Sequence, residues 1–120
     1  MFLALDHVQL AIPVGGEDAA RRFWCELLGF TELPKPESLA KRGGAWFENG
    51  LVQVHVGVET PFVPARKAHP AFRVLDLATL AAQLTDSGHP VRWDTEIPEV
   101  IRCHADDPFG NRIELIQADH

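Results

Sequence analysis

The sequence predicts an α+β fold in which two βαβββ modules form one curved open barrel with the helices outside. One observation is the order of apolar segments, which gives a strand, a helix and three further strands twice along the chain. A second is spacing. Gly29 and Gly88, which each follow a helical pattern, are 59 residues apart, and the triplets 52–54 and 113–115 are 61 residues apart. Near-constant separations indicate one unit that has been duplicated with small changes in its loops.

The first module is expected over about residues 3–58. Its helix is indicated by apolar residues at helical spacing, and Gly29 can adopt the left-handed conformation that ends a helix. Asn49-Gly50 between two apolar runs is typical of a β-hairpin. The expected elements are a strand over 3–12, a helix over 17–28, a short strand over 30–33, a polar loop over 34–44, and strands over 45–48 and 51–56.

A linker over about 59–68, which contains two prolines, leads to a second module over about 69–118. Asp76 is expected to cap its helix, and Gly88 to end it. We expect residues 1–120 to form a single domain with enough chain to bury one core. The expected elements are a strand over 69–74, a helix over 77–86, a short strand over 91–93, a strand over 100–105, a turn over 107–111 and a last strand over 112–117.

Composition and charge narrow the classes of function. The chain has 46% hydrophobic and 23% charged residues, which is ordinary for a globular protein, and its formal net charge is −6. This acidic balance argues against nucleic acid and anionic membranes as partners. No apolar run reaches membrane-spanning length and no signal peptide is visible. We therefore expect a cytoplasmic protein whose two cysteines are reduced.

Three polar residues occur in apolar runs that are predicted to be strands: His7, His69 and Glu114. Two imidazoles and a carboxylate on separate strands can bind one divalent metal ion, and mixed nitrogen and oxygen ligation suits Mn, Fe, Ni, Co or Zn. His7 and His69 are 62 residues apart, which is close to the spacing of the duplication. The sequence therefore predicts a metal site to which both modules contribute.

Four segments, spread over almost the whole chain, carry a more specific pattern. They are Leu5-Asp6-His7-Val8, Phe23-Trp24-Cys25-Glu26-Leu27-Leu28-Gly29-Phe30, His69-Pro70-Ala71-Phe72-Arg73-Val74 and Asp107-Pro108-Phe109-Gly110-Asn111-Arg112-Ile113-Glu114-Leu115. In combination they resemble the vicinal oxygen chelate superfamily, which includes glyoxalase I, bleomycin-resistance proteins, fosfomycin-resistance thiol transferases and extradiol dioxygenases. The resemblance implies paired βαβββ modules, a homodimer, a small-molecule substrate and one divalent metal ion on inward strand residues.

Carried over residue by residue, the resemblance assigns His7, His69 and Glu114 to metal positions and Gln53 to a possible fourth position. Glyoxalase I has a glutamate at that fourth position, where it serves as a ligand and as a proton-transfer base. A glutamine amide binds metals weakly and cannot act as a base. The three-ligand pattern is thus closer to the fosfomycin-resistance enzymes, or to the two-histidine, one-carboxylate triad of non-haem iron oxygenases.

Two further histidines are catalytic candidates. His55 shares a strand face with Gln53 and could be a general base, an alternative ligand or a solvent-facing residue. His104 occupies a position where members of the superfamily often have a substrate-facing tyrosine, and a surface histidine is the alternative. The substrate-binding candidates, for which core packing or exposed salt bridges are the alternatives, are Trp46, Arg73, Trp93 and Arg102.

The leading functional hypothesis is a divalent-metal-dependent lyase, isomerase or transferase that acts on a small oxygen-bearing electrophile or thiol adduct. A metal with open positions would stabilise negative charge as it forms on substrate oxygens. The alternatives are a metal-free small-molecule binding protein of the bleomycin-resistance type and a small extradiol-type dioxygenase.

Overall fold

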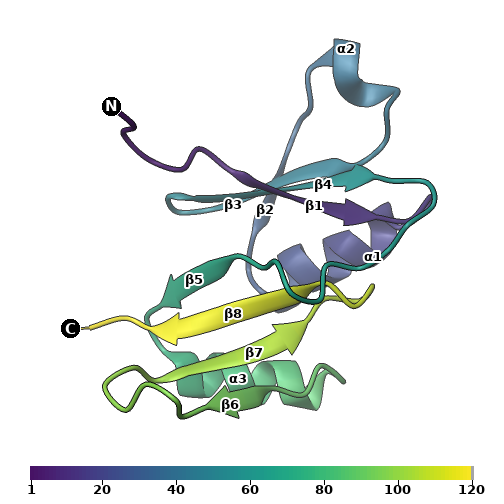
Figure 1. Cartoon of the computed structure of the whole chain (residues 1–120). Coiled ribbons are helices and arrows are strands. Elements are labelled where there is room, and N and C mark those ends of the chain that lie inside the picture. The colour runs from purple at the N-terminus through teal and green to yellow at the C-terminus, as the bar shows by residue number, and fades with distance from the viewer. Residues whose placement is uncertain (120) are drawn as a thin grey trace. The chain divides into compact units, whose positions relative to one another are not determined.

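The structure, a computed structural model, describes residues 1–119 and divides the chain into two compact units (Figure 1). Unit 1 is Met1–Val63, and unit 2 begins at Pro64. The boundary lies inside the linker that the sequence predicts. Each unit is described by itself.

Unit 1 contains one four-stranded mixed sheet with the strand order β1-β4-β3-β2. Strand β1 pairs with β4 in parallel, and the other neighbours are antiparallel. Figure 1 shows the helical segment over residues 17–27, labelled α1, lying along one face of this sheet. The elements are β1 (Val8–Ile12), α1 (Glu17–Arg21), the π-helix η1 (Arg22–Leu27), β2 (Thr31–Leu33), α2 (Glu37–Ala40), β3 (Ala45–Asn49) and β4 (Val52–Val58).

Unit 1 departs from the sequence-based expectation in three places. The first strand begins at Val8 instead of residue 3, and its parallel pairing with β4 starts at Val8 opposite Val54. The segment 34–44, predicted to be a loop, contains the short helix α2. The expected hairpin joins β3 and β4, but Asn49 pairs with Val52, so Gly50 and the following residue form the turn. Gly50 has a φ of 58°, which a two-residue hairpin turn favours.

Unit 2 repeats the arrangement with the strand order β5-β8-β7-β6, and again the first and last strands are the parallel pair. The helix and the last strand have the bounds predicted from the sequence. The sequence predicts the first strand of this unit from residue 69, but the strand begins at Ala71, so His69 and Pro70 precede it. The elements are β5 (Ala71–Val74), α3 (Leu77–Asp86), β6 (Arg92–Asp94), β7 (Arg102–Asp106) and β8 (Arg112–Gln117).

Each sheet has an apolar face and a polar face, because side chains alternate along a strand. In unit 2, α3 packs against β8 and buries Leu77, Ala81 and Leu84. Cys103, Ile113 and Leu115 are buried on the strands. Glu114 and its cross-strand partner His104 point to the other face. In unit 1 the buried apolar strand residues are Leu10, Ile12, Ala45, Phe47, Val54 and Val56.

The α+β class and the βαβββ repeat are therefore confirmed, and neither sheet is closed on itself. Among residues 1–119, no helix has the length and apolar character needed to cross a membrane.

Candidate functional site

Unit 2 brings His69, His104 and Glu114 together on the polar face of its sheet. Glu114 Oε1 lies 2.9 Å from His69 Nε2 and 3.4 Å from His104 Nε2, and the candidate ligand atoms all lie within 4.8 Å of one another. Two atoms that each bind one ion at 2.0–2.2 Å are separated by about 3.0–3.5 Å at octahedral or tetrahedral angles. The two distances from Glu114 Oε1 are therefore close to those between two ligand atoms of one divalent metal ion. We call these three residues the carboxylate cluster.

Glu114 is a buried charge, 6% exposed, that is held from two sides. Its Oε2 accepts a hydrogen bond from Arg102 at 3.1 Å, while Oε1 faces the imidazoles. Arg102 also donates to Asp94 at 2.9 Å. Burial favours a raised pKa for Glu114, but the hydrogen bonds from His69 and Arg102 and the positive charge of Arg102 outweigh it, so the pKa is lowered. The carboxylate is thus kept ionised with Oε1 directed at the cluster.

The two imidazoles of the carboxylate cluster have different surroundings. His69 Nδ1 lies 2.8 Å from the carbonyl oxygen of Lys67. When Nδ1 donates to that carbonyl, Nε2 is the nitrogen that can bind a metal, which is a common arrangement for metal-binding histidines. Burial lowers the pKa of His104, although Glu114 acts in the opposite sense. His104 is therefore favoured in the neutral form, which can accept a proton or bind a metal.

A buried turn between β7 and β8 fixes the strands that carry the cluster. The Asp107 carboxylate accepts hydrogen bonds from the backbone N–H groups of Phe109 and Asn111 and from the Asn111 side chain. The side-chain oxygen Oδ1 of Asn111 accepts a hydrogen bond from the N–H of Ala65 at 2.9 Å. Burial raises the pKa of Asp107, and these hydrogen bonds partly offset that effect. The Asp-Pro-x-Gly-Asn segment is therefore a structural clamp that sets the register of His104 opposite Glu114.

Unit 1 stacks three rings on the polar face of its own sheet. The ring of His55 lies between those of Trp46, at 4.4 Å, and His7, at 4.0 Å, with interplanar angles of 10° and 15°. His7 Nδ1 is 2.9 Å from the Asp6 carboxylate. His55 is 6% exposed, and its Nε2 has no hydrogen-bond partner among the described residues. Burial, followed by the neighbouring His7, lowers the pKa of His55.

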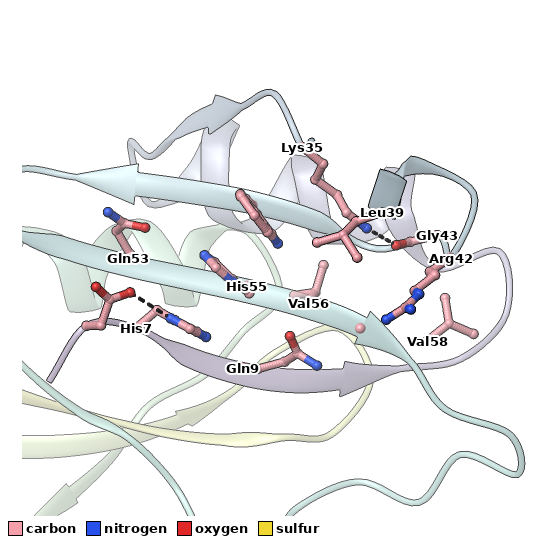
Figure 2. Close-up of a pocket in the computed structure, with 13 residues that line it drawn as sticks. His7, Gln9, Lys35, Leu39, Arg42, Gly43, Gln53, His55, Val56 and Val58 are labelled. Atoms are coloured by element: carbon pink, nitrogen blue, oxygen red, sulfur yellow. Dashed lines mark hydrogen bonds and ion pairs between the residues drawn. The ribbon is translucent and has the colours of Figure 1, made fainter. Parts of the chain in front are cut away.

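These rings form one end of a cleft of about 510 Å³ on unit 1 (Figure 2). Gln53 and Gln9 also line it, and Figure 2 shows Lys35 and Arg42 at the end away from His7. Gln53 lies on the strand face predicted from its parity with His55. We call this feature the unit 1 cleft.

The predicted site residues thus fall into two groups. His7, Trp46, Gln53 and His55 line the unit 1 cleft. His69, His104, Glu114 and Arg102 are neighbours in unit 2, where the Arg102 guanidinium is already paired with two carboxylates.

Two predicted substrate-binding residues are not part of either group. Trp93 pairs with Cys103, so the register places it on the face opposite Glu114. Arg73 is exposed on β5, opposite Ile116, and forms no ion pair among the described residues.

Sequence reasoning missed Asp94, Gln9, Lys35 and Arg42. Asp94 comes to the site only because β6 pairs with β7, where it faces Arg102. Gln9 follows His7 by two residues in a strand, so the same alternation that linked His55 to Gln53 could have found it. Lys35 and Arg42 lie in the segment predicted to be a polar loop, and no sequence signal places them beside β4.

Comparison with solved structures assigns the fold. A glyoxalase family protein from Bacillus anthracis is 48% identical, with 99% of this chain and 98% of that chain covered and a TM-score of 0.94. The fosfomycin resistance protein FosX from Listeria monocytogenes is 12% identical over 99% of this chain and 96% of its own, with a TM-score of 0.79. FosX from Mesorhizobium loti is 15% identical over 99% and 95%, with a TM-score of 0.72. Neither the protein-family models nor the curated proteins give a match.

The repeated βαβββ units and the match to the Bacillus anthracis protein define the class. The chain belongs to the glyoxalase family, within the vicinal oxygen chelate superfamily. The two FosX structures share this fold.

Proposed function

We propose that this protein is a divalent-metal-dependent enzyme of the glyoxalase family that acts on a small oxygen-bearing electrophile as a lyase, isomerase or transferase. The observation that supports it most directly is the buried Glu114, whose Oε1 faces two imidazole nitrogens while Arg102 occupies Oε2. One carboxylate oxygen and two imidazole nitrogens form a set of ligand atoms that can bind Mn, Fe, Ni, Co or Zn.

In this proposal His69 and Glu114 supply two metal ligands. His7 is the third ligand on the basis of the sequence pattern, and His104, which shares Oε1 of Glu114 with His69, is the alternative third ligand. A bound metal would act as a Lewis acid toward substrate oxygens. When His104 is not a ligand, its neutral imidazole, favoured by the lowered pKa, can accept a proton. Arg102 would hold Glu114 in place and would not itself contact the metal.

The test is metal binding by protein purified without a histidine tag. We expect calorimetric titration with Mn, Fe, Ni, Co or Zn to give one site per chain. Glu114→Gln and His69→Ala should each lower the affinity for the metal by at least about 100-fold, because each removes a ligand. Glu99→Gln is the matched control, since Glu99 is exposed and outside the cluster. Equal metal affinity in Glu114→Gln and in the control would contradict the proposal.

Two further variants assign the third ligand. His7→Ala should lose metal affinity to the same extent as His69→Ala, while His104→Ala should retain the metal and lose activity toward small oxygen-bearing electrophiles. The reverse pattern would make His104 the ligand. A protein that binds none of these metals would instead be a metal-free binding protein of the kind that bleomycin-resistance proteins represent. Homodimerisation stays a prediction that native mass measurement can check.

A further inference from the structure

Strands β6 and β7 lie side by side in unit 2 (Figure 1), and among the described residues two aspartate–arginine pairs join them. Arg92 and Asp106 form one pair, with hydrogen bonds of 3.0 Å and 3.2 Å. Their side chains are 50% and 46% exposed. Arg102 and Asp94 form the other pair at 2.9 Å, and these side chains are only 19% and 23% exposed. The Arg102 guanidinium also bonds Glu114, so the more buried pair is connected to the carboxylate cluster.

Arg102 uses a different nitrogen for each carboxylate. Its Nη1 donates to Oε2 of Glu114 at 3.1 Å, and its Nη2 donates to Oδ2 of Asp94 at 2.9 Å. Its Nε is buried and has no hydrogen-bond partner among the described residues, so these two bonds set the orientation of the guanidinium. Asp94 is itself fixed, because its Oδ1 accepts from the backbone N–H of Glu96 at 2.9 Å. The aspartate therefore holds one arm of the guanidinium away from Glu114.

This restraint decides which oxygen of Glu114 is available to a cation. An arginine and a carboxylate pair well through two parallel hydrogen bonds, one from each of two nitrogens. If Arg102 were released from Asp94, it could turn and bond both oxygens of Glu114. In the observed arrangement Arg102 bonds Oε2, while Oε1 lies 2.9 Å from Nε2 of His69. Asp94 also adds negative charge, so the charge of Arg102 does not cancel that of Glu114.

We propose that Asp94 is a positioning residue for the metal ligand Glu114. By holding Nη2 of Arg102, it prevents the guanidinium from bonding both carboxylate oxygens and keeps Oε1 available to a divalent cation. This inference rests on the proposed function, because it takes Glu114 as a ligand. Residues that orient a metal ligand commonly change metal affinity by about 10–100-fold when they are replaced.

The experiment titrates the full chain, purified without a histidine tag, with Co²⁺ and follows binding by calorimetry and visible absorption. Asp94→Ala should bind Co²⁺ about tenfold more weakly than the unchanged protein and should alter the absorption of the bound ion, because Arg102 then competes for Oε1. Asp94→Asn keeps an oxygen that can accept from Arg102, so it should lose less affinity. Asp106→Ala is the matched control, because it breaks the other aspartate–arginine pair between the same strands. It should change the affinity by less than about twofold.

A double variant separates positioning from a purely structural role. Adding Arg102→Gln to Asp94→Ala should recover most of the lost affinity, because a neutral amide does not compete with a cation for Glu114. A loss of structure around β6 would not be reversed by this second substitution. If Asp94→Ala does not fold, Asp94→Asn with and without Arg102→Gln gives the same comparison.

The outcomes separate the role of Asp94 from the metal site. Equal affinities in Asp94→Ala and Asp106→Ala, or no recovery in the double variant, would overturn the role of Asp94 and leave the metal site standing. Failure of the unchanged protein to bind Co²⁺ would contradict the metal site itself, and the role of Asp94 with it.

Discussion

Substituting Asn111 with alanine should destabilise the strands that carry the carboxylate cluster. Asn111 is 1% exposed, donates to the Asp107 carboxylate at 2.9 Å and accepts from the Ala65 N–H at 2.9 Å. The substitution removes one hydrogen bond to a charged group and leaves a partly buried N–H without its partner. These losses are worth about 1.5–3 and 1–2 kcal/mol, so we expect a loss of about 3 kcal/mol in the free energy of unfolding.

Urea unfolding followed by far-UV circular dichroism gives this free energy, provided that the slope against urea is unchanged. In thermal unfolding the same loss corresponds to a fall in Tm of about 12 °C for a chain of this size. Asn49→Ala is the control, because Asn49 donates to the Gly29 carbonyl at 3.3 Å in an exposed setting and should cost less than about 1 kcal/mol. If both variants lose the same stability, the turn is not the clamp that its hydrogen bonds indicate.

Two further substitutions test the backbone and a helix cap. Gly44→Ala should lower the free energy of unfolding by more than about 2 kcal/mol, because the φ of Gly44 is +82° and a Cβ would lie 2.2 Å from the Val56 carbonyl oxygen. Gly50→Ala is the control and should cost about 1 kcal/mol, because Gly50 has a φ of +58° and open space around it. Equal losses in urea unfolding would contradict this prediction. The Thr79 hydroxyl and N–H lower the pKa of Asp76, so its contribution to stability is present above its unfolded pKa and is lost as pH falls through the lowered folded value. As pH is lowered from about 6 to about 2, the free energy of unfolding should therefore fall less in Asp76→Asn than in the unchanged protein. The same pH dependence in both proteins would argue against the cap.

Local sequence patterns predicted most of the fold because they reflect local physics. The helix that begins at Leu77 and the strand over Arg112–Gln117 have the predicted bounds, since a capping residue and an alternating apolar run define them. The starts of β1 and β5 were predicted too early: their pairing begins at Val8 and Ala71, although β4 and β8 each extend two residues farther. His7 and His69 consequently lie just before their strands.

The candidate site was only partly predictable for a similar reason. Glu114 stood out because a carboxylate inside an apolar strand needs partners, and His69 because of its spacing. The role of Arg102 depends on Asp94, which reaches it only through the pairing of β6 with β7. Likewise, Trp93 looked like a pocket residue until its register with Cys103 placed it on the other face.

Comparison of equivalent positions shows how the two copies have acquired different electrostatics. In unit 2, Glu114 lies opposite His104, and in unit 1 the corresponding cross-strand pair is Gln53 and Glu48. Gln53 carries no charge, so the carboxylate of the unit 1 pair belongs to Glu48 on the neighbouring strand. Two strand positions on, His55 lies against Trp46, so the polar face of unit 1 offers rings and neutral donors.

The cations Lys35 and Arg42 of the unit 1 cleft come from a segment that has no counterpart helix in unit 2. The polar face of unit 2 thus has the buried carboxylate of Glu114, whereas unit 1 has the neutral Gln53 at that position and two cations at the far end of its cleft. The duplicated strands explain the shared scaffold, whereas the single exchange at Gln53 and the segment around α2 explain why the two copies are not chemically equivalent.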